Sequence, residues 1–312
     1  MAGWKPEPAA PRHGHGEMKR LLYILFGRIP HYSLEARYSI LSALRWPAGG
    51  AQDIRVSVIT DDPEPFRDWP VDLVLLSEDQ IRQWRGPDNF AWRVKIVGLI
   101  HALEQWGGAL IYLDTDTWFA QPAEAAFARV GPGRSLMHAC HGPILSPDLT
   151  NPLAQRLRNG LQAAFPDLRV PRAGREAFAI DPRQGHMWNA GVVGLHEAQA
   201  PLLHEALALS DALYPVLKDG IEEQLALSLV LQQSTELRPA EDIVEHYWNK
   251  WPIPGLGYSP RDYIHRQLQR FFAAHGGASF EQLRAAAGAF TPRRFRRPWW
   301  LKALQAFSRR SG

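Results

Sequence analysis

Short apolar runs alternate with amphipathic segments through the first third of the chain. Lys19–Phe26 and Ile54–Thr60 are mostly apolar runs of strand length, and Gly27 and Pro30 end the first of them. Between them, Tyr32–Trp46 carries apolar residues three or four positions apart, which is the spacing of one helical face. The pattern therefore predicts a strand, a helix and a second strand in succession.

The same alternation continues up to a pair of aspartates. Val71–Leu76 has the character of a strand, Trp92–Gln105 has helical spacing, and Ala109–Leu113 is fully apolar. Alternating strands and helices predict an α/β fold with a mostly parallel sheet and helices on both faces. Ligands of such sheets bind beyond the carboxyl ends of the strands, and Asp114 and Asp116 follow the end of the last strand.

Asp114 and Asp116 are the first candidates for chemistry. Residues two apart in an extended chain point the same way, so both carboxylates can converge on one divalent cation. Such a cation would stabilise the charge that builds up on a departing diphosphate. The segment Leu113–Thr117 is therefore predicted to be the centre of a site for a divalent cation and a diphosphate, although two acids can also share a solvated turn.

Two further segments offer groups that suit a sugar phosphate. Arg93 and Lys95 begin the helix before the aspartates, where a cation could orient a carboxylate and reach a phosphate; a solvated helical face is the alternative. Asn189 offers both a donor and an acceptor to sugar hydroxyls, and Gly191 permits close approach of a ligand. An ordinary entry into a strand would explain this second segment equally.

The last two segments lie in the second half of the chain. Glu223 and Gln224 begin an apolar helix, where acids also simply favour the helix dipole. His246 follows a predicted strand, and a neutral imidazole there could complete a metal shell. Lys250 could bind a phosphate. A structural role for the histidine is the alternative.

In this order, five segments resemble the GT-A-fold glycosyltransferases, most closely the family-eight type of glycogenin and the lipopolysaccharide α-galactosyltransferases. The resemblance runs from Leu21 to about Trp251, most of the chain. The chain departs from the family pattern after His246, and it has Glu223-Gln224 where the family has Asp-Gln. The segments that carry the resemblance are Trp92–Lys95, Tyr112–Asp116, Trp188–Val192, Glu223-Gln224 and His246-Tyr247.

The resemblance implies a hexosyltransferase that retains the anomeric configuration and uses a nucleotide-sugar donor, with UDP-sugar expected. It implies Mn²⁺ (or Mg²⁺) held by Asp114, Asp116 and His246. A glycan or lipid-linked acceptor, in lipopolysaccharide or surface polysaccharide synthesis, would receive the sugar.

The resemblance also assigns roles around the donor. Arg93 and Asn189 would contact the donor sugar, and Glu223 and Gln224 would lie beside the reacting anomeric carbon. The remaining donor-binding residues are expected to be Phe26, Gly27, Tyr32 (stacked on the base), Lys95, Asp114, Thr115 and Lys250.

The positive charge of the chain is concentrated at its C-terminus. Residues 291–312 carry seven of the 35 Arg and Lys and no acid, so the remainder, with 32 acids, carries −4. A general nucleic-acid surface is therefore not expected. Cations interleaved with tryptophans suit an anionic membrane surface; a solvated tail or a helix packed on its own domain are the alternatives.

Composition also bounds the location and the domains. No apolar run approaches the ~20 residues that span a bilayer, and residues 1–18 lack a signal-peptide core. We expect a cytoplasmic protein, peripheral on the inner membrane through its tail. Its parts are a disordered leader (1–18), a transferase domain (19–258) and a helical extension (259–312).

Two other functions use the same aspartates. A nucleotide-sugar-binding protein without turnover would keep the donor site, and only activity would distinguish it. A haloacid-dehalogenase-type phosphatase also has Asp-x-Asp after an apolar strand, but it requires Thr or Val where this chain has Trp118.

Overall fold

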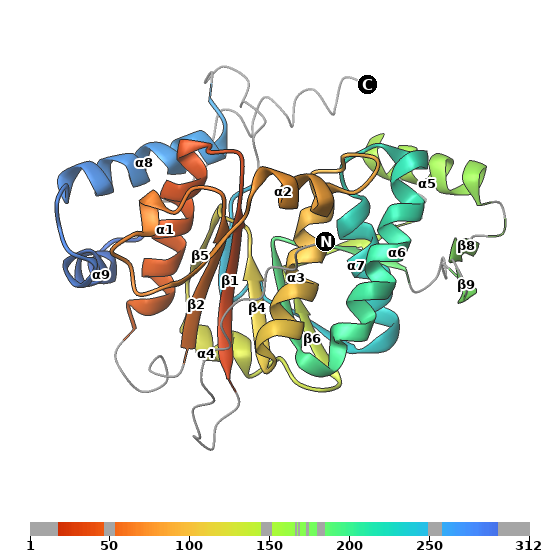
Figure 1. Cartoon of the computed structure of the whole chain (residues 1–312), viewed down its shortest axis with the longest axis horizontal. Helices are drawn as coiled ribbons and strands as arrows, with labels where there is room; N and C mark the ends of the chain where they lie inside the picture. The colour runs from red at the N-terminus through yellow and green to blue at the C-terminus, as the bar shows by residue number, and fades with distance from the viewer. Residues whose placement is uncertain are drawn as a thin grey trace, which may run out of the picture.

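A seven-stranded sheet forms the centre of the protein (Figure 1). The computed structural model describes residues 18–46, 54–144, 152–165, 167, 169–172, 175–179, 185–248 and 258–292. In spatial order the strands are β12 (Glu236–Pro239), β6 (Arg134–Met137), β11 (Val192–His196), β4 (Ala109–Leu113), β1 (Lys19–Leu25), β2 (Ile54–Thr60) and β3 (Asp72–Leu75).

Four of the six pairings in this sheet are parallel, which confirms the predicted mostly parallel sheet. Strand β11 is the exception, because it runs antiparallel to both β4 and β6. Its first residue, Val192, pairs with Leu113, the last residue of β4. The chain entering β11 therefore meets the chain leaving β4 at one edge of the sheet.

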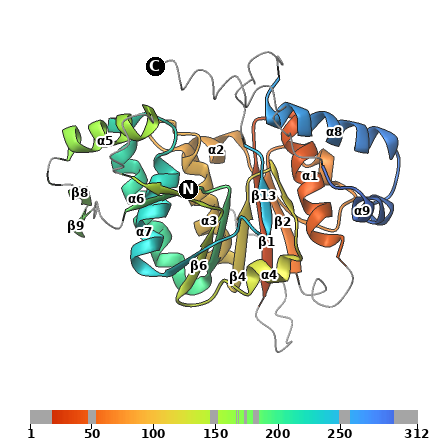
Figure 2. The same cartoon turned by 180° about the vertical axis from the view of Figure 1, so that it is seen from behind.

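Helices cover both faces of the sheet, as the alternation along the chain predicted (Figure 1 and, from behind, Figure 2). In β1, Leu22 packs into the core on the face covered by α3, α6 and α7, whereas Leu21 and Tyr23 pack into the core under α1 and α4. The helices are α1 (Pro30–Leu44), α2 (Glu78–Arg85), α3 (Arg93–Trp106), α4 (Ala123–Phe127), α5 (Pro152–Ala164), α6 (Ala200–Leu217), α7 (Glu222–Ser234), α8 (Pro260–Ala274) and α9 (Phe280–Ala289), with 3₁₀ turns η2 (Glu64–Phe66) and η3 (Glu197–Gln199).

Three pairs of short strands complete the described structure. All three pairs are antiparallel, and one of them joins the residues after the two aspartates to a segment far along the chain, with His246 opposite Thr117. The pairs are β5 (Thr117–Phe119) with β13 (Val244–His246), β7 (Cys140–Pro143) with β10 (His186–Trp188), and β8 (Arg169–Arg172) with β9 (Arg175–Ala179).

The region after residue 258 shares a core with α1. Tyr38 and Leu41 of α1 pack with Ile264, Leu268 and Phe271 of α8, all buried. Helix α8 is started by a capping box, in which the Ser259 hydroxyl accepts from the backbone of Asp262. The helical extension predicted from the sequence is thus built onto the first helix of the fold.

Some expectations concern residues that the structure does not describe. Lys250, the leader up to residue 17 and the tail from residue 293 lie outside the described residues. Within the described part, no helix is both long and apolar enough to cross a membrane.

Candidate active site

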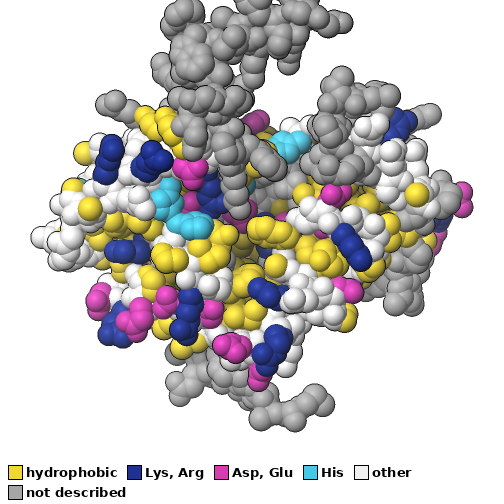
Figure 3. Space-filling model, turned by 90° about the horizontal axis from the view of Figure 1, so that it is seen from above, with side chains coloured by type: hydrophobic (Ala, Val, Ile, Leu, Met, Phe, Trp, Pro, Cys, Tyr) yellow, Lys and Arg dark blue, Asp and Glu magenta, His cyan; other side chains and the backbone are white. Residues whose placement is uncertain are grey.

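One cavity of about 750 Å³ opens at the edge of the sheet where β1 and β4 end. Figure 3 looks onto this end of the molecule, where acidic, basic and histidine side chains gather among apolar ones. The cavity is lined by eleven residues that the sequence assigned to the site: Phe26, Gly27, Tyr32, Lys95, Asp114, Thr115, Asp116, Asn189, Glu223, Gln224 and His246.

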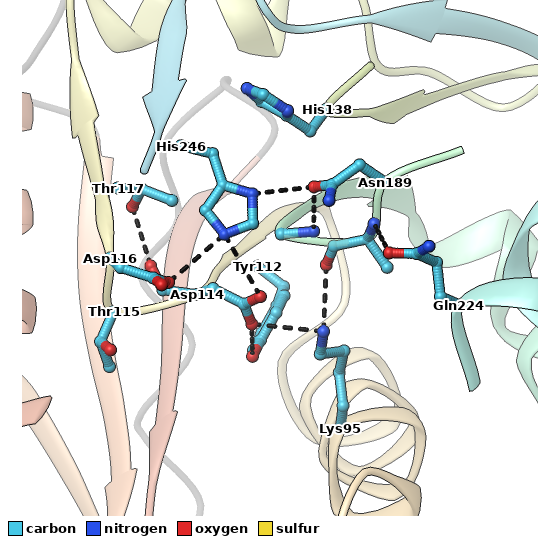
Figure 4. Close-up of polar contacts among 12 residues, drawn as sticks. Lys95, Tyr112, Asp114, Thr115, Asp116, Thr117, His138, Asn189, Gln224 and His246 are labelled. Carbon is cyan, nitrogen blue, oxygen red and sulfur yellow. Dashed lines mark hydrogen bonds and ion pairs between the residues drawn. The ribbon is translucent and has the colours of Figure 1, made fainter. Parts of the chain in front are cut away.

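Asp114, Asp116 and His246 converge as the sequence resemblance implied (Figure 4). One ligand atom from each lies within 4.8 Å of the others. His246 Nε2 is 3.3 Å from Asp116 Oδ1 and 3.8 Å from Asp114 Oδ2. The pairing of β13 with β5 brings the histidine there, and Tyr247 N donates to the Asp116 carbonyl oxygen to hold the two segments together.

The tautomer of His246 is set by Asn189. The Asn189 Oδ1 accepts from Gly191 N at 2.9 Å, so it is an acceptor, and His246 Nδ1 lies 2.8 Å from it and donates. In the neutral ring, His246 Nε2 is then left with its lone pair, buried and without a hydrogen-bond partner, facing two carboxylates. A lone pair among anions is the arrangement that a bound cation would satisfy, so these residues fit a divalent metal.

Lys95 lies inside the site and not on a solvated helical face. Its ammonium is 3.2 Å from Asp114 Oδ1 and 3.3 Å from Glu223 Oε1, and it donates to the Ala190 carbonyl at 3.2 Å. Burial lowers the pKa of Lys95, but the two carboxylates outweigh burial and raise it. The pKa of Glu223 is raised because burial outweighs the nearby ammonium. Lys95 thus compensates the charge of two acids from different elements.

Asp116 is held as an anion. Burial alone would raise the pKa of its carboxyl, but the positive charges that can face it, the protonated form of the His246 ring and the Arg261 guanidinium, outweigh burial and hold the pKa well below its ordinary value. Asp114 is oriented separately, since the Tyr112 hydroxyl donates to its Oδ1 at 2.5 Å. The two aspartates therefore point into the site with different partners.

The loop before β11 is fixed by helix α7. Ala190 N donates to Gln224 Oε1 at 3.1 Å, and Trp188 N donates to Ser228 Oγ at 2.9 Å. The sequence indicated that Gly191 admits a ligand; the structure shows instead that it admits the ring of His246. A Cβ on Gly191 would lie 2.2 Å from His246 Cε1, which is far inside contact distance.

Arg93 is not among the residues that line the cavity, so its placement does not support the predicted contact with a donor sugar. Its Nε and Nη2 donate to Asp211 of α6 at 2.7 and 3.1 Å, and its Nη1 donates to the Trp84 carbonyl at 2.9 Å. The guanidinium joins α3 to α6, because Asp211 of α6, which does not line the cavity either, offers it a bidentate partner.

Two residues that sequence reasoning missed are Glu35 and Arg261. Glu35 lies in α1 and is fully buried, and Arg261 lies at the start of α8 and lines the cavity. An acid beside the apolar stripe of the predicted first helix was the available signal for Glu35. No local signal marks Arg261, since only the docking of α8 on α1 brings it to the aspartates.

The end of β1 supplies the other side of the cavity. Gly27 has φ +93°, which favours glycine, and its N–H donates to Asp61 Oδ2 at 2.9 Å. Phe26 and Tyr32 line this side together with apolar Ile24 and Ile29. The Thr115 hydroxyl donates to Glu35 Oε2 at 2.9 Å, so the Thr115 side chain is bound to α1 and forms part of the cavity wall. The cavity therefore has one apolar, aromatic side and one charged side.

No protein-family model matches the chain, and no curated protein matches it. Several solved structures are similar. They include mouse xyloside xylosyltransferase 1 (12% identity over 71% of this chain and 84% of that chain, TM-score 0.44) and the galactosyltransferase LgtC with donor and acceptor sugar analogues (12% identity over 91% and 99%, TM-score 0.46). The glycosyltransferase GlyE of Streptococcus pneumoniae TIGR4 is a third (11% identity over 86% and 62%, TM-score 0.43).

Proposed function

We propose that this protein is a metal-dependent glycosyltransferase that takes a sugar from a nucleoside-diphosphate donor. The observation that carries the proposal is the unpartnered Nε2 of His246, buried between Asp114 and Asp116. Two carboxylates and one imidazole would hold Mn²⁺ or Mg²⁺, and the bound ion would supply charge stabilisation to a departing diphosphate. The surrounding cavity has the size of a small-ligand site.

The two sides of the cavity suit the two ends of such a donor. The apolar side, with Phe26 and Tyr32, would receive the base, and Gly27 leaves room beside it. The charged side would receive the diphosphate and the sugar. UDP is the nucleotide that we propose, with Mn²⁺ as the ion.

The groups beside the transferred sugar would be Asn189, Glu223 and Gln224. Asn189 Oδ1 is committed to His246 and to the backbone, so its amide nitrogen is the group that can reach a sugar hydroxyl. Glu223 is buried against Lys95 with its Oε2 unpartnered. We propose transfer of a hexose with retention of configuration to a glycan or lipid-linked acceptor, in lipopolysaccharide or surface polysaccharide synthesis.

The basic and aromatic sequence from residue 291 onwards supports a second proposal, that this segment binds the anionic cytoplasmic face of a membrane. Full-length protein should sediment with anionic vesicles, and protein ending at residue 292 should not. Equal sedimentation of both forms would contradict the proposal. Donor binding should be the same in both forms, because the described cavity contains no residue of this segment.

Calorimetry with UDP, GDP, CDP and dTDP, in Mn²⁺ and in EDTA, tests the donor site. We expect one diphosphate to bind only with metal, and Asp116→Ala to abolish this binding. Asp242→Ala is the control, since Asp242 pairs with Arg129 outside the cavity and is half-exposed. Binding that persists in EDTA or in Asp116→Ala would contradict the metal site.

Turnover distinguishes the transferase from its two alternatives. Release of UDP and free sugar from a UDP-sugar, dependent on Mn²⁺, would exclude a binding protein without activity. Release of inorganic phosphate from simple phosphomonoesters would instead favour the phosphatase. The donor that is hydrolysed also identifies the sugar.

A further inference from the structure

Arg261 enters the site from α8 and is held there by a buried carboxylate of α1. Its Nε donates to Glu35 Oε1 at 2.9 Å and its Nη2 donates to Glu35 Oε2 at 2.6 Å. Glu35 is 0% exposed and Arg261 7% exposed. This is a bidentate pair that fixes the plane of the guanidinium.

The third nitrogen of the same guanidinium reaches the candidate metal site. Arg261 Nη1 lies 3.0 Å from Asp116 Oδ2, while the other oxygen of Asp116 lies on the side of His246. Thr115 donates to Glu35 as well, so the turn that carries both aspartates is joined to Glu35 directly through Thr115 and indirectly through Arg261. The two oxygens of Asp116 therefore have separate partners.

Burial of these charges has no evident structural reason. The surrounding core of α1, α8 and α9 is apolar, and apolar side chains of similar size would often stabilise such a contact as well as an ion pair. The net charge of the site, however, suits a bound cation. Two positive side chains, Lys95 and Arg261, face four carboxylates, those of Glu35, Asp114, Asp116 and Glu223. With the neighbouring His246 and His265 rings neutral, four anions against two cations leave the charge that one divalent ion would neutralise.

We propose that Arg261 is a positioning residue of the metal site, held in place by Glu35. Arg261 pairs with Oδ2 of Asp116. The other oxygen, Oδ1, is then free to bind the ion together with His246 Nε2 and Asp114. Helix α8 is then part of the site and not only a cover over α1. This inference rests on the proposed function, because it assumes that the aspartates bind a metal.

Two physical effects of Arg261 predict opposite results. If its charge merely repels the ion, removing it will tighten metal binding. If it positions Asp116, removing it will weaken metal binding, since partners of metal ligands typically contribute 10- to 100-fold to affinity. The sign of the change therefore decides between the two effects.

The test is the Mn²⁺ affinity of the full-length protein, measured without any nucleotide from the electron paramagnetic resonance signal of free Mn²⁺. We expect Arg261→Met and Glu35→Gln to weaken binding about tenfold or more, with a changed spectrum of the bound ion. Arg261→Lys, which keeps the charge and loses the planar fork, should weaken it too. Arg20→Lys is the control, because Arg20 is a buried arginine paired with Asp72 at the opposite end of the sheet.

The outcomes separate this inference from the proposed function. Unchanged or tighter Mn²⁺ binding by Arg261→Met and Arg261→Lys would overturn the positioning role while leaving the metal site intact. Absence of Mn²⁺ and Mg²⁺ binding by the unaltered protein would overturn the proposed function itself. If Arg261→Met does not fold, Arg261→Lys with Glu35→Gln decides the question.

Discussion

Substitution of Gly191 by alanine tests the metal site by a steric change of one methyl group. Gly191 does not have a positive φ, so alanine is compatible with the backbone. The new Cβ would lie 2.2 Å from His246 Cε1 and 2.3 Å from its Nδ1. The ring would have to retreat by about 1.2 Å to reach the ordinary contact distance of 3.4 Å.

A displacement of that size removes a metal ligand. Metal–ligand distances are held within about 0.2 Å, so a ring that has moved by about 1 Å no longer coordinates. The hydrogen bond from His246 to Asn189, which sets the tautomer, would be broken by the same movement. We expect Mn²⁺ affinity to fall at least about tenfold, which is on the order of 1.4 kcal/mol.

The assay is titration of Mn²⁺ against the purified variant, followed by paramagnetic resonance or calorimetry, together with urea unfolding. Two glycine variants serve as controls. Gly133→Ala has open space around its Cβ and should change neither quantity. Gly194→Ala, three residues further on in β11, would place its Cβ 2.8 Å from Leu136 and Val130, so it should destabilise the fold without weakening Mn²⁺ binding.

The reasoning would be refuted by Mn²⁺ affinity within twofold of the unaltered protein in a folded Gly191→Ala variant. That result would mean that His246 is not a ligand, or that the loop moves away at no cost. Loss of affinity in Gly194→Ala to the same extent would show that general strain, and not the position of the histidine, is responsible.

Two further substitutions test other parts of the site. Lys95→Met would leave Asp114 and Glu223 buried without their cation, so we expect the free energy of unfolding to fall by about 3–5 kcal/mol in metal-free urea titrations; a loss below about 1 kcal/mol would contradict the ion-pair arrangement. Arg93→Ala should cost about 1 kcal/mol by removing the pair with Asp211 and should leave nucleotide affinity unchanged; tenfold weaker nucleotide binding would restore the donor contact predicted from the sequence.

The roles of the two basic residues at the start of α3 show where sequence reasoning reached its limit. Arg93 and Lys95 are two positions apart, and both could reach a phosphate on the evidence of spacing alone. In the fold, Lys95 faces the sheet and meets two acids, whereas Arg93 meets Asp211, 118 positions further along the chain. The resemblance assigned both residues to the donor site, but in the fold their side chains point in different directions and meet different partners.

The sequence by itself determined the alternating strands and helices up to Leu113 and the position of the aspartates at the end of that series. Strands Ile54–Thr60 and Ala109–Leu113 have the bounds predicted for them, and the aspartates follow the second at the carboxyl edge of a mostly parallel sheet. These features depend on the periodicity of apolar residues and on turn-forming residues, which act over a few positions. Local physical chemistry is readable without knowledge of distant partners.

Only the tertiary structure decided which side chains meet. Glu35 and Arg261 are 226 positions apart, and their pairing exists because α8 docks on the apolar face of α1. The ring of His246 fits against Gly191 because two strands from distant parts of the chain end at the same place. Contacts of this kind depend on how elements pack in space, and no local pattern of residues encodes them.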